Sequence, residues 1–162
     1  MGLVDSLHVA DGMGLPFLHV KAGGSVCPSS QFTVDHRLHF TYQEGRTVYR
    51  YAVSAMGDDC TKLIERNGLT PEDINYVVPH QANLRIIEAV GKRIGVQPEQ
   101  VLVNIQRYGN TSAACMPLVL WDFEKQLKKG DNLIFTGFGA GFVHGASYYK
   151  WAYDGTSAVA KK

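Results

Sequence analysis

The chain has 162 residues, of which 45% are hydrophobic and 19% are charged, a composition typical of one globular domain and not of a disordered protein. Lys and Arg together number 16 against 15 Asp and Glu, and this balance argues against a dedicated nucleic-acid-binding protein, which would carry a basic excess. The three cysteines show no paired spacing, so we expect no disulfide framework and a reducing, cytoplasmic location. The pattern of charged and apolar residues predicts neither a secretory signal nor a membrane span.

The predicted elements begin with an irregular segment. The first 40 residues are rich in Gly, Pro and Ser and predict turns between short strands, such as one over residues 17–20. Apolar residues three and four positions apart then predict a helix over 46–67, which Gly68 ends and after which Thr70 caps a new turn. Later patterns predict strands over 74–80, 101–105, 131–141 and 142–153, helices over 81–95 and 114–129, and a frayed tail over 156–162.

The order of these elements predicts the fold class. Strands that alternate with helices favour parallel pairing, with the helices packed on the sheet. The last two predicted strands are too close together for a crossover helix, so they are expected to form a hairpin. We therefore predict an α/β domain over residues 1–155 with a mixed, mostly parallel sheet flanked by helices.

Three groups capable of chemistry each follow a predicted strand. His80 ends the strand over 74–80, Asn110 follows the strand over 101–105, and a Gly-rich turn, Gly139–Gly141, follows the strand over 131–141. In an open α/β sheet, ligands bind outside the carboxyl ends of the strands. We therefore expect these three groups to lie along one rim of the sheet.

His80 and Asn110 each allow two interpretations. His80 either satisfies a local backbone group or, next to a helix N-terminus that disfavours a positive imidazole, donates a neutral N–H to a developing oxyanion. Asn110 either caps the helix that follows or provides a second uncharged donor. Two neutral donors aimed at one oxygen suit an enolate or a tetrahedral thioester intermediate. The Gly-rich turn is either a plain hairpin or a backbone N–H that approaches a reacting carbonyl.

Other candidate sites are weaker. His36 and His39 fall on opposite faces of a strand-like stretch and lack further ligands, so we expect no metal site. The segment TGFGAGF departs from a dinucleotide fingerprint, because its third Gly comes one residue early and a strand follows in place of a helix. Cys60 and Cys115 are expected to be small core residues.

Three motifs in order, VVPHQANLRII, RYGNTSAA and GFGAGFVHG, resemble the C-terminal half of β-ketoacyl-acyl-carrier-protein synthase III. This condensing enzyme starts bacterial fatty-acid synthesis and has a thiolase-like fold, so the resemblance implies a thiolase-like half-fold. The similarity extends over nearly the whole chain, from about residue 2 to residue 151. DSLHVADG is similar to the opening strand of that half, and YQEGRTVYRYAV to a Gly-containing segment that leads into a helix.

The resemblance also implies roles for individual residues. His80 and Asn110 match the His and Asn of a Cys-His-Asn triad, which promote decarboxylation of malonyl-carrier protein and stabilise the enolate. The backbone N–H of Ala140 matches a donor of the oxyanion hole, and His144 stands where a Trp is frequent. Residues that match carrier-protein and pantetheine contacts are Arg85, Asn83, Gln81 and Gly45.

One element of the family is missing from this sequence. The nucleophilic Cys of the family lies in the N-terminal half, and no Cys here occupies that motif, so we expect that this chain cannot condense substrates alone. The expected substrates are acyl-CoA and malonyl-acyl-carrier protein, with no cofactor. The expected partners are acyl carrier protein, the missing N-terminal half and, through an exposed apolar face, a second copy of the chain. Two other hypotheses stay open: a non-catalytic module that binds pantetheine or a carrier protein, and another thiolase-like condensing enzyme.

Overall fold

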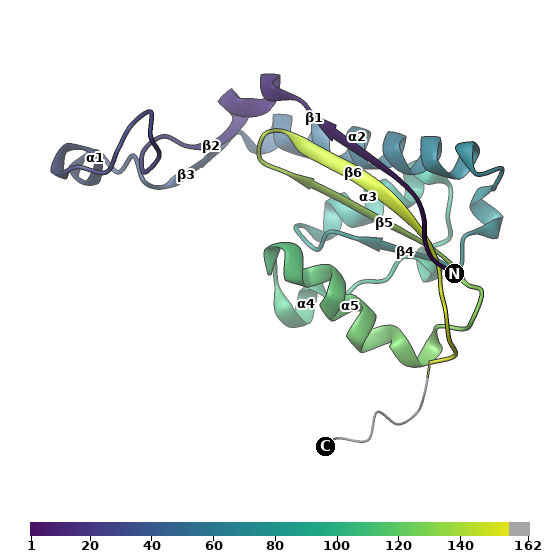
Figure 1. Ribbon diagram of the computed structural model, residues 1–162. Helices are drawn as coiled ribbons and strands as arrows, with labels where there is room; N and C mark the ends of the chain where they lie inside the picture. The colour runs from purple at the N-terminus through teal and green to yellow at the C-terminus, as the bar shows by residue number, and fades with distance from the viewer. Residues whose placement is uncertain (156–162) are drawn as a thin grey trace, which may run out of the picture.

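The computed structural model describes residues 1–155, and its largest element is a four-stranded sheet with the strand order β1-β6-β5-β4 (Figure 1). The strands of this sheet are β1 (Gly2–Ala10), β4 (Tyr76–Pro79), β5 (Asn132–Gly139) and β6 (Val143–Lys150). The predicted α/β fold with a mixed sheet and a C-terminal hairpin is confirmed. The expectation of a mostly parallel sheet is wrong: β4 and β5 are parallel, but β6 runs antiparallel to both β5 and β1. The predicted frayed tail lies outside the described residues.

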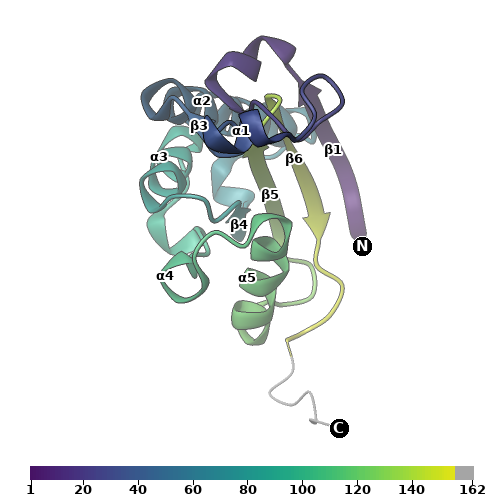
Figure 2. The same cartoon turned by 90° about the vertical axis from the view of Figure 1, so that its left-hand side faces the viewer.

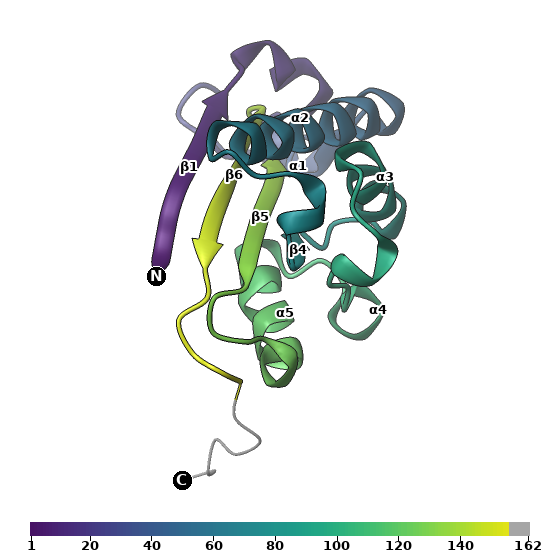
Figure 3. The ribbon, with the colours of Figure 1, turned by 90° about the vertical axis from the view of Figure 1, so that its right-hand side faces the viewer.

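Helices cover both faces of the sheet. Figures 2 and 3 show α2 (Gly45–Arg66) and α3 (Leu84–Ile94) together on one side of the strands, with α5 (Cys115–Phe123) apart from them. Successive residues of a strand point to opposite faces. Accordingly, Val77 of β4 packs in one core cluster with Leu63 of α2, while the next residue, Val78, packs in another cluster with Val119 of α5.

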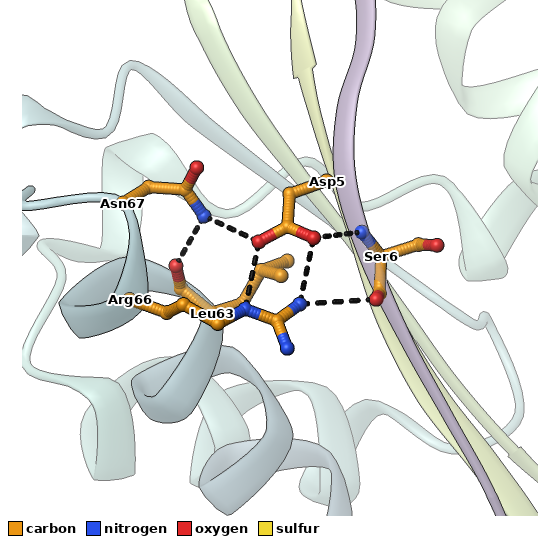
Figure 4. A network of polar contacts seen from close by, with 5 residues as sticks. All are labelled: Asp5, Ser6, Leu63, Arg66 and Asn67. Carbon is orange, nitrogen blue, oxygen red and sulfur yellow. Dashed lines mark hydrogen bonds and ion pairs between the residues drawn. The ribbon is translucent and has the colours of Figure 1, made fainter.

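A polar network ties the C-terminal end of α2 to the edge strand β1 (Figure 4). Arg66 donates from Nε and Nη2 to the two carboxylate oxygens of Asp5, at 2.8 and 2.7 Å, and Asn67 Nδ2 donates to Asp5 Oδ2 at 2.9 Å. The hydrogen bonds from Arg66, and to a smaller extent from Asn67, lower the pKa of Asp5. The helix ends as predicted, because Gly68 adopts a left-handed conformation with φ of +67°.

The predicted strand over 101–105 is wrong. Within the described residues, this segment forms a single parallel bridge, between Val101 and Val77 of β4. The short helix α4 (Ile105–Tyr108) then begins. The physical reason is the side chain of Gln81. Its Oε1 accepts hydrogen bonds from the backbone N–H groups of Asn104 at 3.0 Å and Ile105 at 3.2 Å, which a longer strand would have offered to a neighbouring strand.

Two helices are shorter than predicted. α3 begins at Leu84 and not at residue 81, because Asn83 caps it by accepting a hydrogen bond from the N–H of Arg85 at 2.9 Å. α5 ends at Phe123 and not at residue 129, and a turn of 3-10 helix follows it. Leu127 is then extended and fully buried, so the chain leaves the helix to place this side chain in the core.

The segment between β1 and α2 forms an arm that projects from the main sheet (Figure 1). Its elements are β2 (Leu18–Val20), α1 (Gln31–Asp35) and β3 (Thr41–Gln43), of which β2 and β3 pair antiparallel. The strand predicted over 17–20 is confirmed as β2. The strand-like stretch expected around His36 is wrong, because this residue caps the end of α1 and its Nδ1 lies 2.8 Å from the carbonyl oxygen of Phe32.

Residues 1–155 contain neither a cluster of metal-ligating side chains nor a helix that could cross a membrane. No group of three or more His, Cys, Asp or Glu side chains is placed to hold a metal ion in this part of the chain. Every helix there is too short or too polar to span a bilayer.

Candidate functional site

His80 lies one residue beyond β4, at the carboxyl end of the strand. Its backbone N–H donates to the carbonyl oxygen of Thr136 at 2.8 Å, so the parallel ladder with β5 continues to His80. The imidazole is partly buried, and this burial lowers the pKa of His80. The neutral form is therefore favoured by desolvation. The N-terminus of the next helix in the chain, which the sequence suggested as the cause, lies further on than predicted, because α3 begins only at Leu84.

Asn110 lies in an exposed loop after α4, so the expectation that it directly follows a strand is wrong. Two residues of this segment have a positive φ, Gly109 at +67° and Ser112 at +54°. For Ser112 such a conformation costs about 1–3 kcal/mol, and strain of this kind clusters at functional sites. The Oδ1 of Asn110 accepts a hydrogen bond from the N–H of Ser112 at 3.0 Å, which leaves the Nδ2 group as the donor of this side chain.

Cys115, the first residue of α5, joins the two segments. Its Sγ lies 3.0 Å from Nδ1 of His80 and accepts a hydrogen bond from the N–H of Gln81 at 3.2 Å. This contact places the start of α5, into which the Asn110 loop leads, at the end of β4. Sequence analysis missed the polar role of Cys115, although the residue stands at the start of a predicted helix. Cys60 and Cys115 are both confirmed as buried core residues, and burial raises the pKa of the Cys60 thiol to about 12.

The Gly-rich turn forms the tip of the β5–β6 hairpin and carries the exposed Ala140. Phe142, close behind the tip, exchanges two backbone hydrogen bonds with Asp11, at 2.6 and 2.7 Å. Its ring is buried against Gly14, where a Cβ atom would lie 2.2 Å from Phe142 Cγ. The tip that presents the N–H of Ala140 is therefore anchored to the segment that follows β1.

A cavity of about 360 Å³ lies over β5 and β6. Its lining includes Met116, Gly137 and Val143. A Cβ atom on Gly137 would lie 3.1 Å from Met116 Cε and 3.7 Å from His80 Cβ. Both side chains therefore lie over this glycine, and an added Cβ atom would crowd Met116 but would make only an ordinary van der Waals contact with His80.

A second cavity, of about 380 Å³, collects three of the four residues predicted to contact the carrier protein and pantetheine. They are Gly45 at the start of α2, and Asn83 and Arg85 at the start of α3. The Arg85 guanidinium lies 5.5 Å from the centroid of the Tyr49 ring. Arg46 also lines this cavity, and the sequence analysis did not select it although it follows Gly45 directly.

Gln81 is the predicted contact residue that the structure places elsewhere. Its side chain is fully buried and does not line the cavity of Gly45 and Arg85. Its Nε2 donates to the carbonyl oxygens of Pro79 at 2.8 Å and Leu102 at 3.3 Å, in addition to the two hydrogen bonds that its Oε1 accepts. The expected channel contact is therefore replaced by a role in holding the backbone around His80.

His144, which stands where the family often has Trp, packs against α2. Its Nδ1 lies 2.5 Å from the Oδ2 of Asp59, a carboxylate that is only 1% exposed. The His144 side chain thus forms a buried polar pair that links β6 to α2. Sequence analysis left the packing at this position open and did not select Asp59.

Comparisons with known proteins show which family this chain belongs to. A family model described as 3-oxoacyl-[acyl-carrier-protein (ACP)] synthase III C terminal matches residues 64–151. A β-ketoacyl-[acyl-carrier-protein] synthase III of Phocaeicola vulgatus is 65% identical over 155 residues, which cover 96% of this chain and 46% of that protein. The chain therefore spans about half the length of the curated relatives it matches.

Solved structures of related enzymes have the same fold as this chain. The 3-oxoacyl-(acyl carrier protein) synthase III of Pseudomonas aeruginosa superposes with a TM-score of 0.81 and 32% identity, over 93% of this chain and 46% of that one. The priming β-ketosynthase of the R1128 polyketide biosynthetic pathway superposes with a TM-score of 0.77 and 30% identity, over 96% of this chain and 46% of that one.

Proposed function

Because this chain belongs to the family of 3-oxoacyl-[acyl-carrier-protein] synthase III C-terminal domains, we propose that it forms the C-terminal catalytic half of such a synthase. The similarity to solved synthases confirms the thiolase-like half-fold. The proposed reaction of the intact enzyme is the decarboxylative Claisen condensation of an acyl-CoA primer with malonyl-acyl-carrier protein, a step of fatty acid biosynthesis. The observation that carries the proposal is the contact between Cys115 and His80, which places the start of α5, five residues after Asn110, at the end of β4.

His80 and Asn110 are proposed to act on the malonyl thioester. When its carboxylate leaves as carbon dioxide, the electron pair moves into the thioester and creates an enolate with negative charge on the carbonyl oxygen. A ring N–H of His80 and the Nδ2–H of Asn110 donate to that oxygen. The partly buried site supports this role, because burial keeps the imidazole uncharged and strengthens its hydrogen bonds.

The enolate carbon then attacks the carbonyl carbon of the primer acyl group. In this step, the new carbon–carbon bond forms and the thioester bond to a nucleophilic Cys breaks, with the sulfur leaving as a thiolate. The N–H of Ala140 is proposed to stabilise the oxyanion of the attacked acyl thioester, which its exposed position at an anchored hairpin tip supports. No metal or organic cofactor takes part in this proposal.

The cavity of Gly45, Asn83 and Arg85 is the proposed entry for the pantetheine arm. Two guanidinium groups, Arg46 and Arg85, line it and match the negative charge of a phosphopantetheine and of an acidic carrier protein. The rigid placement of Asn83 as the cap of α3 supports a fixed hydrogen-bonding position at the mouth.

The nucleophile is proposed to come from a complementary Cys-bearing half. Cys60 and Cys115 are both buried, at 0% and 1% exposure, which disfavours either as an acyl acceptor. Large apolar side chains such as Trp121, on α5 and 67% exposed, provide surface for that half or for a second copy of this chain. A cytoplasmic location is proposed from the free thiols.

The alternative proposal is a non-catalytic module that binds pantetheine or a carrier protein. It is favoured by the cavity of Gly45 and Arg85, which this chain forms without a partner. A different thiolase-like condensing activity is also compatible with the similarity to the R1128 priming ketosynthase.

The test is the release of carbon dioxide from a malonyl thioester by this chain mixed with a matching Cys-bearing half. Turnover that falls by about 100-fold or more in His80→Ala and in Asn110→Ala supports the enzyme, since one oxyanion donor is worth about that much. Carrier-protein binding with no turnover in any mixture supports the module.

A further inference from the structure

We propose that Cys115 is a positioning residue that holds His80 in the tautomer with Nδ1 unprotonated and the hydrogen on Nε2. The two atoms that carry this inference are Cys115 Sγ and His80 Nδ1, 3.0 Å apart. Nothing in the sequence indicates this pairing, since the residues lie on different elements, α5 and the end of β4. The catalytic consequence rests on the proposed function, whereas the tautomer itself does not.

The hydrogens around the sulfur indicate which atom donates. The thiol sulfur already accepts a hydrogen bond from the N–H of Gln81, at 3.2 Å. If Nδ1 of His80 also donated to it, two donors would converge on the sulfur. The thiol hydrogen would then need another acceptor at a position that is only 1% exposed. If the thiol donates to Nδ1 instead, the thiol hydrogen and the Gln81 N–H both have partners, and the ring hydrogen lies on Nε2 of an imidazole that is only partly buried.

This arrangement decides what the other ring nitrogen can do. A neutral imidazole carries one hydrogen, so an accepting Nδ1 places that hydrogen on Nε2 and makes it a donor. A donor suits the stabilisation of an enolate oxygen, whereas a base needs an unprotonated Nε2. The same chain contains the opposite case, because Nδ1 of His144 donates to the carboxylate of Asp59 at 2.5 Å.

The direct test is ¹⁵N NMR of the histidine side chains in the full chain, in solution or as a sedimented sample, near neutral pH. His80→Gln identifies the signals of His80 by their loss, and His144 serves as an internal reference with Nδ1 protonated. We expect His80 to show a protonated Nε2 and an unprotonated Nδ1. A His80 that carries its hydrogen on Nδ1, or that is doubly protonated, overturns the proposal.

Variants of Cys115 test the cause. Cys115→Ser keeps a donor and should preserve the tautomer, while Cys115→Ala removes the donor and should shift His80 toward the Nδ1-protonated form. Cys60→Ala is the matched control, because it also removes a buried thiol but one that does not contact His80. A tautomer that is unchanged in Cys115→Ala overturns the proposal even if the wild-type tautomer is the expected one.

Activity separates this inference from the proposed function. With the complementary half present, Cys115→Ala should lower malonyl decarboxylation about tenfold. This is the lower end of the range for residues that orient a functional His. Cys115→Ser should be much less affected. If His80→Ala does not reduce decarboxylation, the proposed function fails while the tautomer result stands. If His80→Ala is inactive but the NMR shows Nδ1–H, the positioning role of Cys115 fails alone.

Discussion

The carboxylate of Asp59 and the imidazole of His144 form a buried cross-link between α2 and β6, with Oδ2 and Nδ1 2.5 Å apart. Asp59 is 1% exposed, and the imidazole of His144 is the partner that the structure gives its carboxylate. The next residue toward the N-terminus, Asp58, instead pairs on the surface with Arg93 at 2.6 Å. Two adjacent aspartates thus offer a buried pair and an exposed pair on one helix.

The first prediction compares these two pairs. His144→Ala leaves the Asp59 carboxylate buried without a partner and should lower the free energy of unfolding by about 3–5 kcal/mol. Asp58→Asn breaks the exposed pair and should cost about 0–1 kcal/mol. Urea unfolding monitored by circular dichroism measures both. Equal and small losses in the two variants would show that Asp59 is hydrated and that the cross-link is not buried.

The second prediction concerns acid stability. The hydrogen bonds from Arg66 and Asn67 hold the pKa of Asp5 below its ordinary value. A carboxyl group whose pKa is lower in the folded state stabilises the fold above its unfolded pKa, and this contribution is lost as the pH falls through the folded pKa. Asp5→Asn should therefore be less stable than wild type at pH 6 but approach it at the acid end of the titration. Urea midpoints across that range test this, and a difference that does not shrink in acid would contradict it.

The third prediction concerns Gln81. Its amide bonds to four backbone groups inside the core, so Gln81→Ala should lower the free energy of unfolding by at least about 2 kcal/mol. Gln106→Ala, on an exposed surface, is the matched control and should change stability by less than about 0.5 kcal/mol. Urea unfolding measures both. A Gln81→Ala variant that is as stable as wild type but binds substrate more weakly would instead support the pantetheine-channel contact that the family resemblance implied.

The fourth prediction concerns the two arginines of the proposed pantetheine entry. Arg85→Ala and Arg46→Ala should each weaken carrier-protein binding several-fold, most strongly at low salt, because charges at the edge of an interface act mainly through long-range attraction. Arg50→Ala is the control, since Arg50 is exposed on α2 but does not line the cavity. Titrations at two salt concentrations measure the effect. Loss of binding in Arg50→Ala alone would place the docking surface elsewhere.

Local patterns were sufficient to predict much of the fold. The spacing of apolar residues and the glycine at position 68 define α2 almost to the residue, and the closeness of β5 and β6 predicts their hairpin. The failures come from contacts between segments far apart in the chain. The run over 101–105 has the composition of a strand, but the Gln81 side chain takes its backbone hydrogen bonds and ends it after one bridge.

The candidate site was likewise predicted where local sequence patterns are informative and missed where distant segments meet. His80 was selected because it ends an apolar run, and the structure places it at the end of β4. Cys115 was missed because nothing near it in sequence is basic or acidic, and its importance arises only when α5 folds against β4. The cause of the neutral imidazole was also misjudged, since burial is a property of the packed chain and not of the nearest helix.

A double-mutant cycle on malonyl decarboxylation shows whether His80 and Asn110 donate to one oxygen. This chain is combined with its Cys-bearing half, and carbon dioxide release is measured for wild type, His80→Ala, Asn110→Ala and the double variant. We predict a fall of about 100-fold in each single variant, and a fall in the double variant that is much smaller than the product of the two. Two effects that multiply, or single variants that retain the wild-type rate, would contradict the shared oxyanion site.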